Sequence, residues 1–348
     1  MELSKKLDTT GDAGHGDPAD APVRPKRRVK FTQEKTVTLI AVALFMLFSA
    51  LLPGFATPEN LLDLVRSVSI LGILGIGLAV TILGRGIDLS MITTMAMSVT
   101  WVLYLIQTGN SVSEALGFGL LLVICIGLLN GWLIAYAEIP ALFTTLAMGT
   151  VVYGFVRMAF VDVDLISLPD NASWLRGLGA RNVFAIPVPV LAFALIAVLA
   201  HLFLRRLSWG LFIRGMGDNP LKARISGIPT RPMMVLQYVI SAAIAFFAGI
   251  VLATLVGTMN TRLVNSGMMY DVILVAVLGG VVLNGGRGDV FHVVVGTLLV
   301  GLLLNGMTIL DISYAVQNLL KGCLLLVAIL IDSLLDPRDE QTSQQGDI

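Results

Sequence analysis

The sequence contains few charged residues. Only 13% of its 348 residues are Asp, Glu, Lys or Arg, whereas about a quarter of a soluble globular domain is charged. Two cysteines and three histidines provide neither a disulfide framework nor the spacing of a metal site. The sequence has no Gly-x-x-x-x-Gly-Lys-Ser/Thr motif, so it cannot bind ATP through a loop of that kind. No nucleophile with a neighbouring base is visible. An ordinary soluble domain is excluded, and nothing indicates an enzyme.

Long apolar segments fill most of the chain instead. Hydrophobic residues make up 56% of the sequence, and the mean hydropathy is +0.87. Apolar runs of about 18 or more residues indicate transmembrane helices, and the runs lack the alternation of barrel strands. We therefore predict an all-α integral membrane protein with about ten transmembrane helices, near residues 36–53, 66–84, 88–106, 115–137, 140–160, 183–204, 233–256, 271–284, 290–310 and 313–335.

The eighth of these segments is short for a straight crossing. It ends in Leu278-Gly279-Gly280 and is followed by Gly285-Gly286-Arg287-Gly288. Interrupted helices are tolerated where they are buried in protein or line a cavity. We expect a broken or closely packed element at 279–280, while a plain flexible turn remains a good alternative for 285–288.

The distribution of Lys and Arg predicts the topology. Most of the 23 basic residues lie in the first 35 residues and in loop 205–232, and cytoplasmic segments carry such an excess. Both termini are therefore expected in the cytoplasm, with an even number of spans, and eight spans would give the same sidedness. The expected organisation is a disordered cytoplasmic tail (1–35), a transmembrane domain (36–335) and a second cytoplasmic tail (336–348). Loops 161–182 and 257–270 would face outward.

Loop 205–232 contains a short predicted helix. Asn219 suits an N-cap and Pro220 the first helical position, and Gly227 suits the position just after a helix end. Leu221 and Ile225 are four residues apart and would share one face. A helix of about two turns needs something to pack against. The loop alone is explained about equally well by a docking element for a soluble partner and by an ordinary basic loop that sets topology. The two caps and the apolar pair favour the docking element.

Four short motifs follow one another within residues 36–335. They are Gly86-Ile87-Asp88-Leu89-Ser90, then Ile139-Pro140 with Thr145-Leu146, then residues 217–228, and last Gly279-Gly280 and Gly285-Gly286-Arg287-Gly288 with Gln317 and Lys321-Gly322. In this order and spacing, the chain resembles the permease subunits of ribose, xylose and related carbohydrate ABC importers. It departs from their pattern at Arg85 and Ile92, where the family usually has glycine, and at Tyr153 and Lys222.

The resemblance implies a multi-pass permease of the bacterial inner membrane that works as a homo- or heterodimer in the lipid bilayer. It implies a separate ABC ATPase, as two copies or one fused subunit, and a periplasmic sugar-binding protein, with no nucleic acid involved. The chain itself would bind no cofactor, since ATP and Mg would bind to the ATPase. The residues of the coupling helix that docks on the ATPase would then be Arg214, Gly217, Asn219, Pro220, Leu221, Ala223, Arg224, Ile225 and Gly227.

Candidate residues for a translocation path or gate are the polar and small residues within the predicted spans. Asp88 could hold a gate or pair with Arg85 or Arg287, although a carboxylate favoured by the helix N-terminus explains it at least as well. Lys321 is an intramembrane charge, and a role in the pore or at a dimer contact is as good an explanation as a buried ion pair, for which Asp271 and Asp311 are candidates. Polar side chains could line the path or hydrogen-bond between helices. The whole set is Asp88, Asn130, Thr144, Thr145, Gly279, Gly280, Asn305, Gln317 and Lys321.

Three functions remain to be compared. The first is an ABC permease for a sugar or sugar-like solute, whose substrate among pentoses, hexoses, polyols, nucleosides and signalling sugars stays open. The second is an ion-coupled secondary transporter, which should carry an acidic site at the membrane midplane, whereas the acidic residues here lie at span ends. The third is a membrane enzyme or assembly subunit, which no catalytic constellation supports.

Overall fold

The computed structural model describes residues 33–183 and 186–335. Ten apolar helices within these residues coincide with the ten predicted segments. They are α1 (Gln33–Leu51), α2 (Pro58–Leu83), α3 (Met91–Gln107), α4 (Val112–Ala135), α5 (Ala141–Ala159), α7 (Val188–Arg206), α10 (Thr230–Val256), α11 (Met268–Gly279), α12 (Val290–Ile309) and α13 (Tyr314–Leu335). The all-α fold is confirmed. The predicted tails lie outside the described residues, apart from the first residues of α1.

Seven of the described helices are long and apolar enough to cross a membrane. They are α2, α4, α5, α7, α10, α12 and α13, whereas α1, α3 and α11 are apolar but shorter. Length alone therefore supports seven crossings, and the count of ten and the cytoplasmic position of the termini stay predictions. As expected for the eighth segment, α11 is the shortest of the ten helices, with 12 residues.

Local sequence signals explain where several helices begin. The Thr57 hydroxyl accepts a hydrogen bond from the amide of Asn60, and Pro58 occupies the first helical position of α2. Ser111 and Glu114 form a capping box at the start of α4. Side chains at these positions satisfy amides that have no partner within the helix. The helix boundaries thus follow from chemistry that is readable in the sequence.

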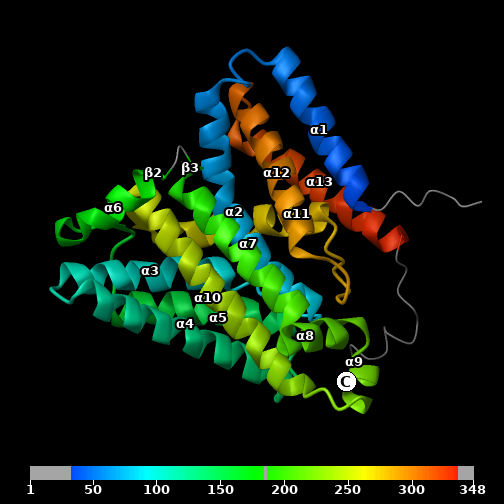
Figure 1. Ribbon diagram of the computed structural model, residues 1–348. Coiled ribbons are helices and arrows are strands. Elements are labelled where there is room, and N and C mark those ends of the chain that lie inside the picture. The colour runs from blue at the N-terminus through cyan, green and yellow to red at the C-terminus, as the bar shows by residue number, and fades with distance from the viewer. Residues whose placement is uncertain (1–32, 184–185, 336–348) are drawn as a thin grey trace, which may run out of the picture.

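The helices α2 and α10 form the centre of the molecule. In Figure 1, α3, α4 and α5 lie on one side of α2, α7 and α10, and α1, α11, α12 and α13 lie on the other. In the most apolar 18-residue stretch of α2, 78% of the stretch is buried within the protein. Helix α4 packs closely on α10, because Gly127 and Gly131 face the backbone of Val239 and Val235. Glycine permits this close approach of two membrane helices.

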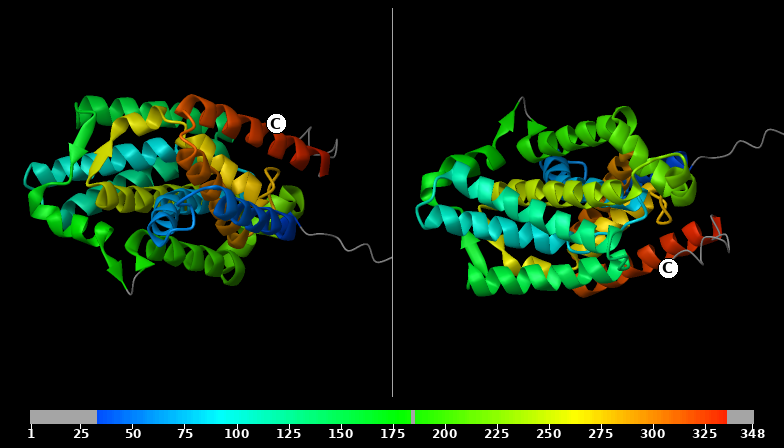
Figure 2. Two further views of the ribbon diagram at one scale, coloured as in Figure 1. Left: turned by 90° about the horizontal axis from the view of Figure 1, so that it is seen from above. Right: turned by 90° about the horizontal axis from the view of Figure 1, so that it is seen from below.

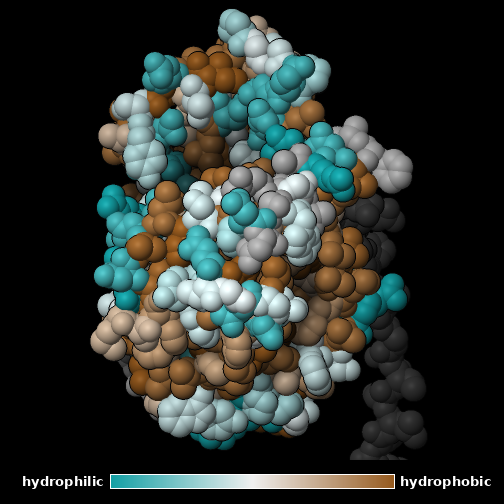
Figure 3. Space-filling model, turned by 90° about the vertical axis from the view of Figure 1, so that its left-hand side faces the viewer, coloured by the Kyte–Doolittle hydropathy of each residue, from teal (hydrophilic) through white to brown (hydrophobic). Residues whose placement is uncertain are grey.

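The end of the bundle where α7 begins carries the small β structure. Strand β1 (Leu165–Ser167) pairs antiparallel with β4 (Thr258–Asn260), and β2 (Asn182–Val183) pairs with β3 (Ile186–Pro187). The short helices η1 (Asp170–Ala172), α6 (Ser173–Ala180) and η2 (Thr261–Asn265) complete this end. Pairing of β1 with β4 brings together the two loops predicted to face outward, 161–182 and 257–270. In Figure 3, hydrophilic side chains are scattered among hydrophobic ones over this side of the molecule.

An ion-pair cluster stabilises this end. Asp164 lies 2.7 Å from a guanidinium nitrogen of Arg262 and 3.3 Å from one of Arg157. The hydrogen bond from Arg262 holds the pKa of the Asp164 carboxyl below its ordinary value. Arg157 also lies 3.8 Å from Asp162. The position of Arg157 at the last turn of α5, beside carboxylates, agrees with a side chain that reaches out of the apolar layer.

Helices α5 and α13 share one largely uncovered apolar face. In the most apolar 18-residue stretch of each helix, only 28% is buried for α5 and 6% for α13. The two views of Figure 2 agree that these helices, far apart in sequence, lie along the same side of the molecule. This face, which we call the α5–α13 face, must be covered by lipid or by another protein chain.

Candidate coupling and translocation site

The predicted short helix is present as α9 (Pro220–Ile225). The Asn219 side chain accepts a hydrogen bond of 2.9 Å from the amide of Lys222. Gly227 has a φ of +82° and donates its amide to the carbonyl of Arg224 at 3.1 Å. Glycine adopts this left-handed conformation without a steric cost. Both predicted caps are thus confirmed.

The two faces of α9 differ sharply in burial. Ala223 is 5% exposed and packs with Ile213, whereas Leu221 is 53% and Ile225 79% exposed. Helix α9 lies at one end of the molecule (Figure 1). Its exposed apolar pair forms a surface that another protein can cover.

The helix that precedes α9 was not predicted. Residues 208–218 form α8 (Ser208–Asp218), where the sequence analysis predicted a loop and placed a helix only after Asn219. Its buried residues are Gly210, Ile213, Met216 and Gly217. Their spacing of three and four residues is the signal that could have identified the helix. Arg214 and Gly217, two predicted coupling residues, therefore lie on α8 rather than on α9.

Three segments meet tightly at the end of α8. A methyl group at Gly217 would overlap the carbonyl oxygen of Leu83 at the end of α2 and approach the amide of Gly286. The Gly286 amide donates to the Leu83 carbonyl at 2.9 Å. Arg85 donates from Nε to the Gly217 carbonyl at 2.8 Å and from Nη2 to the Asp218 carbonyl at 3.2 Å. We call this contact of α2, α8 and the 284–288 turn the glycine junction.

Arg85 occupies a backbone conformation that favours glycine. Its φ is +62°, and an L residue there costs of the order of 1–2 kcal/mol. The two hydrogen bonds to the end of α8 offset this cost. The departure from the family pattern at this position therefore replaces a glycine by a side chain that ties α2 to α8.

We expect Gly217→Ala to disrupt the glycine junction. The added methyl group meets backbone atoms on two neighbouring segments, which cannot move aside as a flexible side chain can. The matched control is Gly215→Ala on the same helix, where the methyl group would meet only Ile228 Cδ1 at 3.5 Å. The apparent unfolding temperature of the purified protein should fall for the first variant only. Equal midpoints for the two variants would contradict the packing.

Asp289 connects the α7–α8 region to the start of α12. Its carboxylate caps α12 by accepting from the Val290 amide at 2.8 Å. It also accepts from Nη2 of Arg205 on α7 and, at 3.1 Å, from Nη2 of Arg214 on α8. His201 Nδ1 lies 3.6 Å away. Burial opposes the charged form, but the Val290 amide and both guanidinium groups hold the pKa of Asp289 below its ordinary value.

The sequence analysis did not single out Asp289. An Asp directly before an apolar run is an N-cap signal, and that signal would have identified the cap. The two arginines lie more than 70 positions earlier in the chain, so no local sequence pattern indicated the cluster.

The predicted gate residue Asp88 lies in a buried polar cluster. It is 1% exposed and accepts from the Ser90 hydroxyl at 2.6 Å, the Ser90 amide at 3.1 Å and the Ser241 hydroxyl at 2.8 Å. Asn130 Nδ2 donates to the Ser90 hydroxyl at 3.0 Å. The suggested pairing of Asp88 with Arg85 is wrong, because the Arg85 side chain donates to the carbonyls of Gly217 and Asp218. The hydroxyl groups of Ser90 and Ser241 and the Ser90 amide hold the carboxylate instead.

Thr145 attaches α5 to the same turn. Its hydroxyl lies 3.2 Å from the Ile87 carbonyl and accepts from the Leu89 amide at 3.1 Å. The neighbouring Thr144 donates to the carbonyl of Pro140, the residue just before α5, at 3.2 Å. The 84–90 turn thus joins α4, α5 and α10 through Asn130, Thr145 and Ser241. The sequence analysis missed buried Gln237 and Tyr238 of α10, which lie against Gly84 and Gly86 of this turn.

The predicted close packing at Gly279 is confirmed. A methyl group there would overlap the carbonyl oxygen of His292 on α12. Gly280 ends α11 with a φ of +96°. Gly296 of α12 approaches the Val275 carbonyl of α11 in the same manner. Through these glycines the backbones of α11 and α12 pack directly against each other.

The remaining candidates lie apart from the Asp88 cluster. Asn305 of α12 and Asn60 of α2 exchange hydrogen bonds of 2.9 and 3.0 Å. Gln317 bonds the Ile312 carbonyl at 2.8 Å, just before α13. Lys321 of α13 lies 2.8 Å from Asp271 of α11, and their side chains are 9% and 14% exposed. Of its two candidate partners, Lys321 pairs with Asp271.

Comparison with known proteins identifies the family. A protein-family profile described as the permease component of the branched-chain amino acid transport system matches residues 60–329. The ribose import permease protein of Bacillus subtilis is 31% identical over 291 residues, which cover 83% of this chain and 89% of the relative. The chain belongs to this permease family. Similarity extends to the L-arabinose transport system permease protein of Escherichia coli K12, with 30% identity over 294 residues covering 84% and 88% of the two chains.

The ribose import permease protein of Haemophilus influenzae is 27% identical over 310 residues, covering 88% of this chain and 95% of the relative. No solved structure matches the chain. Membership in the sugar ABC permease family, together with several long apolar helices, makes the chain a multi-pass protein of the inner membrane. Permeases of this family are transport subunits that work with an ATPase and a periplasmic binding protein.

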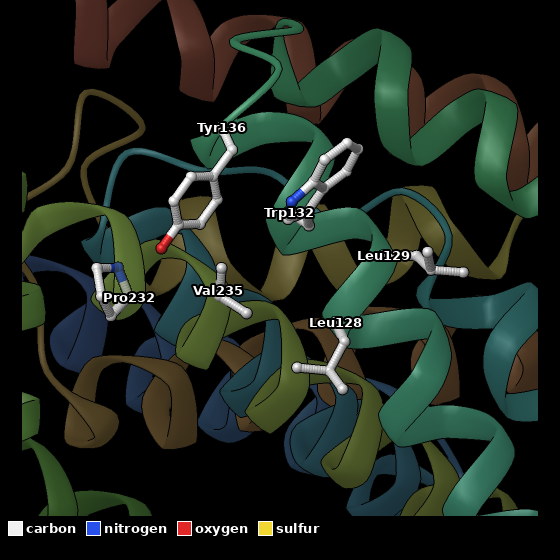
Figure 4. A pocket seen from close by; sticks show the side chains of 6 residues that line it. All are labelled: Leu128, Leu129, Trp132, Tyr136, Pro232 and Val235. Carbon is white, nitrogen blue, oxygen red and sulfur yellow. The ribbon is translucent and has the colours of Figure 1, made fainter.

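A surface groove of this permease lies between α4 and α10. It has a volume of about 510 Å³ and is lined by Leu128, Leu129, Trp132, Tyr136, Pro232 and Val235. Figure 4 shows Tyr136 and Pro232 at one end and Leu128 at the other. The mostly apolar lining offers few hydrogen bonds to a sugar, and none of the predicted path residues contributes to it. The groove is therefore distinct from the candidate path.

Proposed function

We propose that the chain is the membrane-spanning permease subunit of an ATP-driven importer for a sugar or sugar-like solute, which a periplasmic binding protein delivers. The exposed apolar pair on the capped helix α9, in a chain of the sugar permease family, carries this proposal. The named functions of relatives, ribose and arabinose permeases, favour a sugar as the substrate.

In this proposal α9 is the coupling helix. An amphipathic helix that places its apolar face in a groove is a common mode of protein recognition. Leu221 and Ile225 would enter a groove of the ATPase, while Lys222 and Arg224 lie beside them on the same short helix. The α9 end then faces the cytoplasm, in agreement with the excess of basic residues. ATP and Mg would bind to the ATPase, as two copies or one fused subunit.

The α5–α13 face is the proposed contact with a second permease, as a second copy or a paralogue. A solute path between two such faces would be lined by the exposed residues of α5 and α13, while Thr144, Thr145 and Lys321 are buried behind this face. The Asp88 cluster ties the ends of α4, α5 and α10 together near the glycine junction. It would thereby hold a gate closed at the cytoplasmic end.

Reconstitution tests the proposal. The chain would be purified with and without a candidate ATPase and placed in proteoliposomes that contain the binding protein and a labelled sugar. Uptake should require the ATPase, the binding protein and MgATP together, and a sugar panel would identify the substrate. Uptake by the chain alone, driven by a proton or sodium gradient, would show an ion-coupled secondary transporter instead.

A further inference from the structure

Asp289 has more contacts than a helix cap requires. One hydrogen bond from the Val290 amide satisfies the cap. The carboxylate also holds Arg205 at the end of α7 and Arg214 in the middle of α8, and its own side chain is only 8% exposed. A buried carboxylate between two cations from other helices fixes the relative position of those helices more tightly than apolar contact alone.

We propose that Asp289 is a positioning residue that fastens the coupling segment, residues 208–225 of α8 and α9, to α12. A displacement of α9 by the ATPase would then also move the α11–α12 hairpin. This inference depends on the proposed function. Helix α8 leads directly into α9 through Asn219, and the glycine junction holds the same end of α8 against the 284–288 turn. The coupling segment is thus attached to the hairpin at two points.

The contacts continue from the hairpin to the α5–α13 face. Helix α12 touches α11 backbone to backbone at Gly279, and Asp271 of α11 pairs with Lys321 of α13. A shift of α8 would therefore reach α13, which lines the proposed path. Spatial continuity alone does not demonstrate coupling, so the role of Asp289 must be tested by a readout that a purely structural residue would not change.

Asp289→Asn separates the two roles of the side chain. Asparagine is nearly the same size and caps helices as well as aspartate does, so α12 should still begin at Val290. It removes the negative charge that holds both arginines. The matched control is Glu138→Gln, which removes a carboxylate from an exposed ion pair with Arg231 at the same end of the molecule and should have little effect.

The experiment uses the permease with its ATPase and binding protein in proteoliposomes, and measures assembly, ATP hydrolysis and sugar uptake. For Asp289→Asn we expect assembly within about twofold and hydrolysis within about threefold of the wild type. Uptake per ATP hydrolysed should fall at least tenfold. Glu138→Gln should keep this ratio.

An unchanged ratio of uptake to hydrolysis, or a parallel fall of both, would overturn the proposal. If Asp289→Asn fails to accumulate in the membrane, Arg205→Gln gives the same test, because it removes one of the cations that Asp289 holds and leaves the cap intact. The wild-type complex is assayed first. Failure of the wild type to assemble with an ATPase would overturn the proposed function itself, whereas an assembled and active wild type with an unchanged ratio in the variants would overturn only the role of Asp289.

Discussion

Replacing Lys321 with Met is expected to destabilise the protein strongly. The substitution removes the cation but leaves the Asp271 carboxylate, only 14% exposed and 2.8 Å from the lost ammonium group, without its partner. Breaking one side of a buried ion pair costs about 3–5 kcal/mol. The apparent midpoint of thermal unfolding in detergent should therefore fall by roughly 10 °C.

Two variants control this prediction. Leu320→Met introduces the same residue at the adjacent position, where the side chain is 41% exposed on the apolar surface, and should leave the midpoint unchanged. The double variant Lys321→Met with Asp271→Leu removes both charges and should recover most of the loss, since an apolar pair often replaces a buried ion pair without penalty. A midpoint for Lys321→Met equal to that of Leu320→Met would show that the pair contributes nothing.

Replacing Ile225 with Asp is expected to prevent assembly with the ATPase. The side chain is 79% exposed on α9, so the substitution should leave the permease folded. In the proposed complex it would place a charge in an apolar groove and remove a central contact. Contacts of this kind contribute about 2 kcal/mol or more to binding, which corresponds to a roughly 30-fold weaker affinity. Co-purification of the ATPase with tagged permease measures the effect.

The control for Ile225→Asp is the same change at the opposite end of the molecule. Val163 precedes β1, is 48% exposed, and lies in a loop that the predicted topology places outside the cell. Val163→Asp should keep full assembly with the ATPase and the normal unfolding midpoint. Loss of the ATPase from both variants, or from neither, would contradict α9 as the docking element.

The helices and the docking element could be predicted from the sequence because their signals are local. A long apolar run must form a helix in lipid, since every backbone polar group must find a partner within the structure. The caps of α9 depend only on Asn219, Pro220 and Gly227, which all lie within one short stretch of the chain. Helix α8 was missed because its apolar spacing is short and lies within a basic stretch.

The sequence by itself determined an all-α membrane protein, the approximate positions of its ten apolar helices and the capped element that we propose for docking, since neighbouring residues decide each of these. Only the tertiary structure decided that Lys321 pairs with Asp271 rather than Asp311, that serine hydroxyls hold Asp88, and that Asp289 joins two arginines. These contacts depend on how helices distant in the chain pack, and the position of a charge along a helix does not specify which neighbour it faces.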